Sequence, residues 1–294
     1  MLDADHVAGF GFPRALAALR QALANGLDPE SEPPRGSVRL GGGEVLIMPS
    51  SAGPVAGIKL VSIVPGNPSR GLPRIHGVYV LFDAETLAPR ALLDGAALTS
   101  LRTPAVSALG VDLVAPPDAR RLVVFGTGPQ AFGHVRALRA IRPLDSVRVI
   151  GRDPSRLAEF VRSLGPDAEA AGPSAVADAD IVACCTTART PLFPGTLLAP
   201  HAVVVAVGSH EPDAREVDTE TVRRCGALVE SRAAATREAG DVMHAIAGGA
   251  IGEDELVTFS DLVRGATPAR PRLIKTVGMG WEDLVIAAAV VDAA

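Results

Sequence analysis

Two hydrophobic patterns divide the chain. Between residues 35 and 93, apolar and polar residues alternate in short runs that glycine and proline clusters separate, which is typical of an antiparallel sheet. Beyond residue 120, short and uniformly apolar runs alternate with helical patterns, which is typical of a parallel sheet covered on both faces. Together the patterns predict an α/β protein with a doubly wound unit and a second unit of the α+β class.

The predicted elements follow from these patterns. A leucine stripe predicts a helix over residues 12–26. The alternating region predicts the strands Ser37–Leu40, Glu44–Met48, Gly57–Val64, Ile75–Phe82 and Arg90–Leu93. The uniformly apolar runs predict the strands Leu122–Phe125, Val147–Ile150, Asp180–Cys185, His201–Val207 and Ala227–Val229. The C-terminal segment, residues 273–292, predicts a short strand, a glycine turn and a final helix.

A proline interrupts the helical pattern between the two regions. Residues 96–101 and 105–114 both have helical patterns, but Pro104 disfavours a helical conformation at Thr103, so we expect two helices with a break. Arg102 then lies beside the N-terminus of the second helix, where its guanidinium group and the helix dipole would attract a carboxylate or a phosphate. The alternative is a surface arginine paired with a nearby aspartate.

The apolar run that ends at Phe125 leads directly into a glycine-rich turn. The turn has the pattern G-x-G-x-x-A and consists of Gly126, Thr127, Gly128, Pro129, Gln130 and Ala131. A strand, such a turn and a helix, in that order, form a Rossmann dinucleotide site in which the pyrophosphate binds at the helix N-terminus. The pattern alone also fits an ordinary strand–helix turn, but the order of the elements favours dinucleotide binding.

The end of the second apolar strand bears on the choice of nucleotide. NAD-binding proteins usually place an acidic residue there to bind the ribose hydroxyls. This chain has Gly151 at that position, followed by Arg152 and Arg156, and two guanidinium groups favour the 2′-phosphate of NADP(H). A shifted register would make Asp153 the acid, which leaves NAD(H) possible. Four residues that end the next two strands should also line the cofactor cleft: Thr186, Thr187, Val207 and Gly208.

Lysine is rare in this chain. Of the 28 basic residues, only Lys59 and Lys275 are lysines. A buried lysine, unlike an arginine, can give up its proton and act in acid–base chemistry. Lys59 shares a strand face with Val61 and Ile63, so its ammonium group either reaches solvent along the apolar surface or lines a closed site.

Composition excludes several classes of protein. The net charge of −5 gives no reason to expect a nucleic-acid partner. No apolar run approaches the ~18–20 residues of a membrane span, and the N-terminus lacks the pattern of a secretory signal. Cys184, Cys185 and Cys225 form neither a disulfide framework nor a zinc spacing. We therefore expect a cytoplasmic protein with no metal and no membrane partner.

Ten short segments occur in an order that identifies a family. They are Pro34–Leu40, Met48–Pro49, Gly57–Val61, Leu81–Asp83, Leu93–Gly95, Thr99–Ala105, Gly126–Gln130, Val207–Gly208, Arg215–Glu216 and Lys275–Met279. In this order they resemble the ornithine cyclodeaminase/mu-crystallin family along nearly the whole chain. The combination is much more specific than any single segment.

The resemblance implies an architecture and a set of site residues. A substrate-binding and dimerisation domain would comprise residues 1–115 and 273–294, with a Rossmann dinucleotide-binding domain inserted at 116–272. Three residues match the family's carboxylate-binding positions: Arg35, Lys59 and Arg102. Two match a segment that lies against the cofactor: Lys275 and Thr276. Members of the family are typically homodimers that bind a small amino or imino acid.

One position departs from the ornithine cyclodeaminases. Those proteins carry an aspartate shortly after the Val-Gly pair, where this chain has His210, and an imidazole would bind the ammonium group of a diamino acid poorly. The segment from Gly208 to Glu216 is closer to the ketimine (pyrroline-2-carboxylate) reductase branch. A loop residue without any role in proton transfer is the alternative for His210.

The sequence therefore predicts NAD(P)H-dependent reduction of Δ1-pyrroline-2-carboxylate or Δ1-piperideine-2-carboxylate to L-proline or L-pipecolate. Lys59, His210 or water would supply the proton for the imine nitrogen. Three alternatives stay open at this point. They are an ornithine cyclodeaminase, an alanine-type amino-acid dehydrogenase, and a non-catalytic mu-crystallin-like protein that binds NADPH or another ligand.

Overall fold

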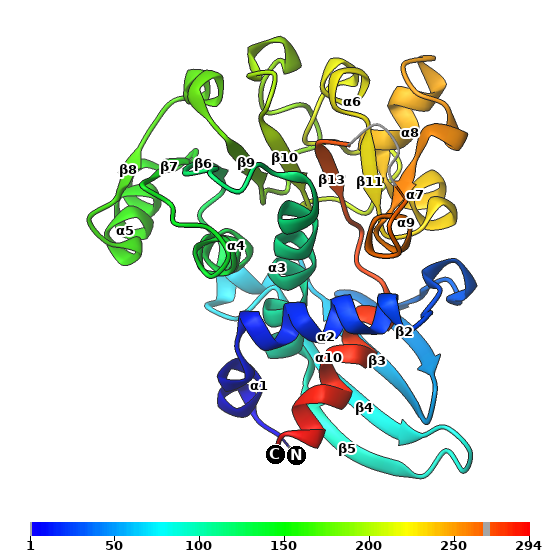
Figure 1. Ribbon diagram of the computed structural model, residues 1–294. Coiled ribbons are helices and arrows are strands. Elements are labelled where there is room, and N and C mark those ends of the chain that lie inside the picture. Colours follow the sequence, from blue (N-terminus) through cyan, green and yellow to red (C-terminus); the bar gives the residue numbers. More distant parts are fainter. Residues whose placement is uncertain (1, 267–270) are drawn as a thin grey trace. The chain divides into compact units, whose positions relative to one another are not determined.

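The computed structural model describes residues 2–266 and 271–294, and the chain folds into two compact units (Figure 1). Unit 1 comprises Met1–Thr103 and Met279–Ala294, and unit 2 comprises Pro104–Gly278. The chain passes from unit 1 to unit 2 inside one helix, whereas the sequence-based boundary lies at the end of that helix, at residues 115/116. Within the described residues, no helix combines the length and apolarity that a membrane span requires.

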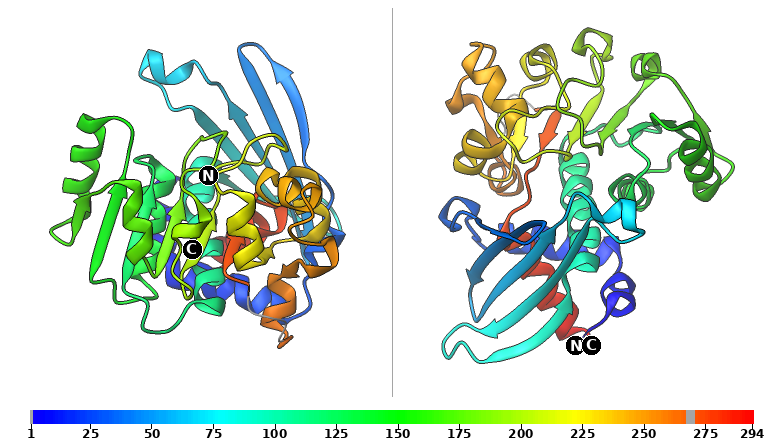
Figure 2. Two further views of the ribbon diagram at one scale, coloured as in Figure 1. Left: turned by 90° about the horizontal axis from the view of Figure 1, so that it is seen from above. Right: turned by 180° about the vertical axis from the view of Figure 1, so that it is seen from behind.

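Unit 1 is built on an antiparallel sheet. Its described strands form one five-stranded sheet in sequential order, and all five were predicted. They are β1 (Gly36–Leu40), β2 (Gly43–Ala52), β3 (Val55–Ile63), β4 (Ile75–Asp83) and β5 (Pro89–Asp94). The helices are α1 (Ala4–Phe10), which the sequence reasoning missed, α2 (Phe12–Ala24), α10 (Gly280–Asp292) and the first part of α3 (Gly95–Val114). Helix α10 packs against β2, β3, β4 and α2 (Figure 2).

The two faces of this sheet differ. On the face toward α10, Leu46, Met48 and Val61 form a buried cluster, and Tyr79 and Leu81 are fully buried. The alternate residues, which we call the outer sheet face, point the opposite way. Its main apolar residues are Val38, Leu40, Val45, Ile47, Ile58, Leu60, Val78, Val80 and Leu92, and the polar residues Ser51, Ser62, His76 and Asp94 share the face. Apolar residues therefore predominate on this face, although Leu40 is 61% exposed and the apolar residues of β2, β3 and β4 are half-buried.

Helix α3 contradicts the predicted break at Thr103. The helix is continuous over residues 95–114, with Pro104 inside it. Pro104 removes one backbone hydrogen bond, which costs about 3 kcal/mol in an ordinary helix. Every residue from 101 to 111 is buried, however, and the apolar area removed from water outweighs that cost. Arg102 therefore lies in a helix interior and not beside a helix N-terminus.

Unit 2 contains the predicted parallel sheet. Its described strands form one eight-stranded sheet in the order β12-β11-β13-β10-β9-β6-β7-β8, and each pairing is parallel. The strands are β6 (Arg121–Phe125), β7 (Ser146–Ile150), β8 (Ala168–Ala170), β9 (Ile181–Cys184), β10 (Val203–Ala206), β11 (Ala227–Val229), β12 (Val257–Thr258) and β13 (Leu273–Lys275). All residues of β9 and β10 are buried, which explains their uniformly apolar sequences.

Helices connect these strands. They are α4 (Pro129–Arg139), α5 (Pro154–Leu164), α6 (Thr219–Cys225), α7 (Arg232–Glu238), α8 (Gly240–Ala247) and α9 (Phe259–Val263). Short 3₁₀ turns occur at η1 (Pro29–Ser31), η2 (Asn67–Arg70), η3 (Pro173–Asp178), η4 (Gly195–Leu197) and η5 (Glu253–Glu255). The strand order reverses direction between β6 and β9, and ligands of such sheets bind at the carboxyl ends of the strands at this point.

Asp180 connects several groups at the opposite edge of the sheet, where the strands begin. Its carboxylate accepts hydrogen bonds from the backbone N–H groups of Arg120 (2.8 Å) and Arg121 (2.9 Å) and from the guanidinium group of Arg121 (2.6 Å). His201 Nε2 lies 2.9 Å away. Burial would raise the pKa of Asp180, but the hydrogen bonds from Arg121, the Arg120 backbone and His201 outweigh it and lower the pKa well below its ordinary value.

We predict that Asp180→Asn lowers the free energy of unfolding at pH 7 by about 1–3 kcal/mol, because several N–H donors lose a charged acceptor. The pKa of Asp180 is lower in the folded protein than the unfolded value of about 3.9, so its contribution is complete above pH ~4 and is lost as the pH falls through the folded pKa. Urea unfolding of both proteins at pH 7 and pH 3 measures the effect.

The difference between the two proteins should be smaller at pH 3 than at pH 7. Asp145→Asn is the matched control, because Asp145 is an exposed partner of Arg120 at 3.4 Å, and exposed pairs contribute little. An equal loss of stability in both variants would contradict the role given to Asp180.

Candidate functional site

The predicted glycine turn joins β6 to α4. Gly126 has a φ of +116°, which favours glycine, and it lies against the carbonyl oxygen of Cys185 at the end of β9. Gly128 is the N-cap of α4, has an extended backbone, and no side chain caps the helix there. A Cβ atom at Gly128 would meet no other atom within 4 Å, so the open space on that side suits an approaching phosphate. The turn therefore fits the pyrophosphate of a dinucleotide.

Gly151, Arg152 and Asp153 follow β7, as expected. Asp153 is the N-cap of α5, and its Oδ1 accepts hydrogen bonds from the N–H groups of Ser155 (2.9 Å) and Arg156 (3.1 Å). This engagement makes Asp153 less suitable as the ribose-binding acid. Arg152 and Arg156 are exposed, and neither forms an ion pair with any residue in the described part of the chain. Both guanidinium groups can therefore accept an anionic ligand.

A buried carboxylate holds the ends of β9 and β10 together. Glu216 Oε1 accepts hydrogen bonds from the backbone N–H and the hydroxyl of Thr186, both at 2.7 Å, and its Oε2 accepts one from the N–H of Gly208 at 2.7 Å. Burial raises the pKa of Glu216, and the charge of Lys275 and these hydrogen bonds oppose the rise. Thr186 and Gly208 are thus fixed at the edge where the cofactor is expected, whereas Thr187 is exposed and Val207 is half-buried.

Lys275, at the end of β13, is 1% exposed and has internal partners. Its ammonium group donates a hydrogen bond to the carbonyl oxygen of Ser209 (2.7 Å) and lies 2.9 Å from Asp241 Oδ2. Asp241 Oδ1 in turn accepts hydrogen bonds from the backbone N–H groups of Glu216 and Val217. These contacts tie the loop after β10, which also carries the half-buried His210, to β13.

The segment after β13 is held by a second buried carboxylate. Glu230, at the end of β11, is 2% exposed and accepts hydrogen bonds from the N–H groups of Val277 and Gly278, both at 2.8 Å. Thr276 is 3% exposed, and its N–H donates to the carbonyl oxygen of Ala206. This segment therefore has a fixed backbone next to the end of β10.

Unit 1 contains a second cluster of buried charges. Lys59 on β3 lies between Met48 and Tyr79 in the sheet register, and its Nζ atom is 2.6 Å from Asp283 Oδ2. Arg102 Nη1 is 2.7 Å from Glu282 Oε2, and Arg102 Nε is 3.5 Å from Asp283 Oδ1. We call these four residues, Lys59, Arg102, Glu282 and Asp283, the charged cluster. Glu282 and Asp283 are in the first turn of α10, where the helix dipole stabilises negative charge.

Burial shapes the acid–base properties of this cluster. Lys59 is 1% exposed and both acids are fully buried. Burial and the positive charge of Arg102 lower the pKa of Lys59 from 10.5 to about 8, and the charges of Asp283 and Glu282 oppose this. Lys59 can therefore exchange a proton near neutral pH, which Arg102 cannot. Of the two possibilities predicted for Lys59, the structure supports the closed environment.

Two more ionisable groups lie near Asp283. Burial, followed by the charges of Asp283 and Glu32, raises the pKa of Tyr79, so its hydroxyl stays protonated. Glu32 accepts a hydrogen bond from the Ser50 hydroxyl at 2.8 Å. Burial and the charge of Asp283 raise the pKa of Glu32 to about 7, against the opposing contacts with Ser50 and the Trp281 backbone. The third predicted cation, Arg35, is half-buried in the segment that leads into β1.

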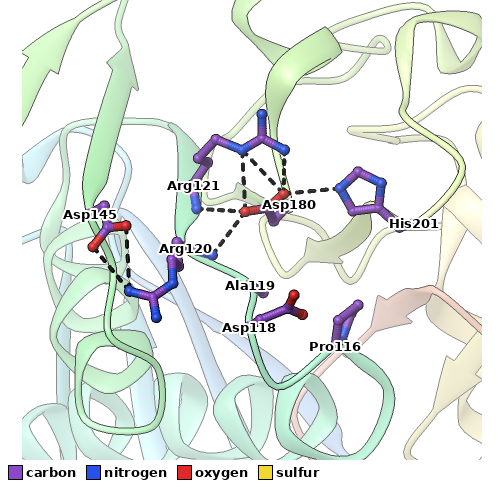
Figure 3. Close-up of a pocket in the computed structure, with 8 residues that line it drawn as sticks. All are labelled: Pro116, Asp118, Ala119, Arg120, Arg121, Asp145, Asp180 and His201. Atoms are coloured by element: carbon purple, nitrogen blue, oxygen red, sulfur yellow. Dashed lines mark hydrogen bonds and ion pairs between the residues drawn. The ribbon is translucent and has the colours of Figure 1, made fainter.

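A separate pocket of about 550 Å³ lies at the amino-terminal edge of the parallel sheet (Figure 3). Residues that line it include Arg120, Arg121, Asp180 and His201. Asp180 is paired with Arg121 and His201, and Arg120 with Asp145, so the lining charges largely satisfy one another. None of the predicted site residues lines this pocket, and ligands of such sheets bind at the opposite edge.

The sequence patterns did not identify the acids that hold the site together. These are Glu216, Glu230, Asp241, Glu282 and Asp283. A signal was present for two of them, because Glu282 and Asp283 are the only charged residues in an otherwise apolar segment from residue 280 to 291. Acids in a buried helix require partners, and a lysine on an apolar strand face requires one too.

Known proteins resemble this chain along its length. A Burkholderia ambifaria protein named Δ1-pyrroline-2-carboxylate reductase 2 is 37% identical over 288 residues, covering 96% of this chain and 91% of that protein. The ketimine reductase mu-crystallin of Mus musculus is 32% identical, covering 80% of this chain and 74% of that protein. The solved structure of Thermococcus litoralis Δ1-pyrroline-2-carboxylate reductase in complex with NADH and L-proline has a TM-score of 0.91 at 26% identity, covering 99% of this chain and 96% of that one.

The resemblance carried by the ten short segments is confirmed by these comparisons. The model of the ornithine cyclodeaminase/mu-crystallin family matches residues 14–294, a range that includes the charged cluster, the glycine turn and both lysines. The chain belongs to the ornithine cyclodeaminase/mu-crystallin family.

Proposed function

We propose that this protein is an NAD(P)H-dependent reductase of small cyclic imino acids, Δ1-pyrroline-2-carboxylate and Δ1-piperideine-2-carboxylate, with L-proline and L-pipecolate as products. The observation that carries this proposal is the charged cluster, which contains one permanent cation and one cation that can titrate near neutral pH. Relatives named Δ1-pyrroline-2-carboxylate reductase support it, including a solved one that holds NADH and L-proline.

The substrate carboxylate is assigned to Arg102, with Arg35 and Lys59 assisting. An ammonium group has three N–H donors, and Asp283 is the ion-pair partner of Lys59 within the described residues, so donors remain for a substrate. Lys59 gives one proton to the imine nitrogen and recovers it from water. When bound, NAD(P)H would supply the hydride for C2 of the imine, which reduces C=N to CH–NH and leaves NAD(P)⁺. Holding these groups in a near-attack geometry can contribute ~7–11 kcal/mol.

The cofactor is assigned to unit 2, at the carboxyl ends of β6, β7, β9 and β10. The N-terminus of α4 would bind the pyrophosphate, and Arg152 and Arg156 the 2′-phosphate of NADPH. Lys275 and Glu216 shape this edge from within and contact the surrounding loops. His210, in the loop fixed by Lys275, is a further candidate for the proton path.

The outer sheet face supports a proposal about the quaternary structure. Antiparallel sheets that face solvent usually carry polar residues on that side, but apolar residues make up most of this face and occur on all five strands. We therefore propose that a second copy of the chain covers it and that the protein is a homodimer. Cys184, Cys185 and Cys225 are free thiols, which suits the reducing cytoplasm that we propose as its location.

We predict that purified protein oxidises NADPH in the presence of either imine and that Lys59→Met lowers kcat/KM at least a hundredfold, because both a carboxylate contact and the titratable group are lost. Loss of absorbance at the nicotinamide band measures the rate, and circular dichroism checks the fold. Arg90→Met on β5, which removes a cation outside the cluster, should leave the rate unchanged.

Other outcomes of this assay identify the alternatives. Ammonia release from L-ornithine would support a cyclodeaminase, and NAD-dependent oxidation of L-alanine would support a dehydrogenase. Tight NADPH binding without turnover of any of these compounds would support a non-catalytic binding protein. No turnover of either imine would refute the proposed function.

We predict that Arg152→Ala lowers kcat/KM for NADPH by about tenfold or more and changes the value for NADH little. A charge-assisted hydrogen bond to the 2′-phosphate, which NADH lacks, contributes about 1.5–3 kcal/mol. The matched control is Arg162→Ala, which removes an exposed arginine from the last turn of α5. Equal losses with both cofactors, or a wild-type preference for NADH, would overturn the assignment of Arg152.

We predict that Leu60→Arg, at the centre of the outer sheet face, converts a dimer into the 30.2 kDa monomer, because a charged side chain cannot be buried there without a partner. Light scattering after size-exclusion chromatography measures the mass. Leu87→Arg, which changes a 63% exposed leucine in the β4–β5 turn, is the control and should stay dimeric. A wild-type monomer would contradict the proposed interface.

A further inference from the structure

The reaction proposed above requires Lys59 as an ammonium ion, yet its surroundings oppose that charge. Lys59 is 1% exposed on the buried face of β3. Removing an ammonium group from water favours its neutral form, and the guanidinium group of Arg102 adds a repulsive charge. Something nearby must offset both effects if the lysine is to hold a proton until the substrate arrives.

Two carboxylates in the first turn of α10 lie close to the two cations. Asp283 Oδ2 is 2.6 Å from Lys59 Nζ, which is the distance of a close ion pair. Glu282 Oε2 is 2.7 Å from Arg102 Nη1, and the second oxygen of Asp283 is 3.5 Å from Arg102 Nε. Adjacent acids on one helix turn thus face different cations, one that titrates and one that does not.

We propose that Asp283 is a positioning residue that holds Lys59 as the ammonium ion from which the substrate nitrogen receives its proton, while Glu282 positions the guanidinium group of Arg102. The proposal rests on the proposed function for its chemical step. Its electrostatic part, the pairing of Asp283 with Lys59, can be tested without any substrate.

Two further ionisable groups, Tyr79 and Glu32, lie near Lys59 or its partner Asp283. Tyr79 is opposite Lys59 on β4, and its raised pKa keeps the hydroxyl neutral. Glu32, which precedes β1, titrates near pH 7 beside Asp283. A rate measurement alone would combine the titrations of Lys59 and Glu32. The test must therefore observe Lys59 itself.

The composition of the chain makes that observation direct. Only two lysines are present, so a protein labelled with ¹³Cε-lysine gives two lysine NMR signals, one each from Lys59 and Lys275. The titration midpoint of Lys59 should lie near pH 8 in the wild type. It should fall by one unit or more in Asp283→Asn, since an opposite charge within ~4–6 Å shifts a pKa by about 1–3 units.

Two internal controls accompany this variant. Lys275 pairs with Asp241 in unit 2, so its signal should not change in Asp283→Asn and reports that the fold is intact. Glu282→Gln should shift the Lys59 midpoint less than Asp283→Asn, because its carboxylate contacts Arg102. If Asp283→Asn does not fold, Asp283→Ser, which suits the first turn of a helix, replaces it in the same experiment.

The kinetic measurement uses the same variants with Δ1-pyrroline-2-carboxylate and NADPH. A proton donor must be protonated, so kcat should fall as the pH rises through the pKa of Lys59. A shift of one unit or more in Asp283→Asn moves this fall to lower pH, so that kcat at pH 8 is about tenfold or more below its plateau at lower pH, compared with about twofold in the wild type. Glu282→Gln should chiefly raise KM and leave the fall near its wild-type position, because arginine does not titrate.

Three outcomes decide the proposal. An unchanged Lys59 midpoint in a folded Asp283→Asn or Asp283→Ser protein would overturn it. A lower midpoint without a matching shift of the pH–rate profile would refute the role of Lys59 as donor. The third outcome is a lower Lys59 midpoint in Asp283→Asn than in the wild type, with no reduction of either imine by the wild type. It would support the pairing of Asp283 with Lys59 and contradict the proposed function.

Discussion

The ion pair between Lys59 and Asp283 is the interaction on which unit 1 depends. A buried ammonium and a buried carboxylate are each costly, and loss of Asp283 would remove the carboxylate that lies 2.6 Å from the ammonium group of Lys59. The pair fixes the first turn of α10 against β3, and Arg102 and Glu282 repeat the arrangement beside it. Because these groups are held in place and can still exchange a proton, the same contacts that stabilise the unit prepare it for acid–base chemistry.

Unit 2 also contains buried carboxylates and a buried lysine. Buried carboxylates of Glu216, Glu230 and Asp241 bind backbone N–H groups at the carboxyl edge of the parallel sheet. Lys275 is the internal cation of this edge and contacts Asp241 and Ser209. The glycine turn keeps an open, uncapped helix N-terminus beside them. Rigid loops and a free anion site are what a dinucleotide requires.

Much of the fold could be predicted because the spacing of apolar residues reflects which residues are buried. In both sheets most of the strands lie where this spacing indicates them. The prediction failed at α3, where tertiary burial outweighs the local effect of Pro104. It also omitted short elements, among them α1, β8 and β12. In the site, a residue could be found from the sequence if it lies in a segment that resembles the family or if its type is rare in the chain. Lys59 meets both conditions. Their partners Asp283 and Glu216 could not be paired from sequence, because the fold alone brings together positions far apart in the chain.

The proposed function depends on transfer of a hydride to the C=N carbon of a cyclic imino acid. The most direct measurement uses NADPH deuterated at C4 of the nicotinamide, in the transferable position, with Δ1-pyrroline-2-carboxylate, followed by mass spectrometry of the product. We predict L-proline with one deuterium at C2. Proline without deuterium, or no proline at all, would contradict it.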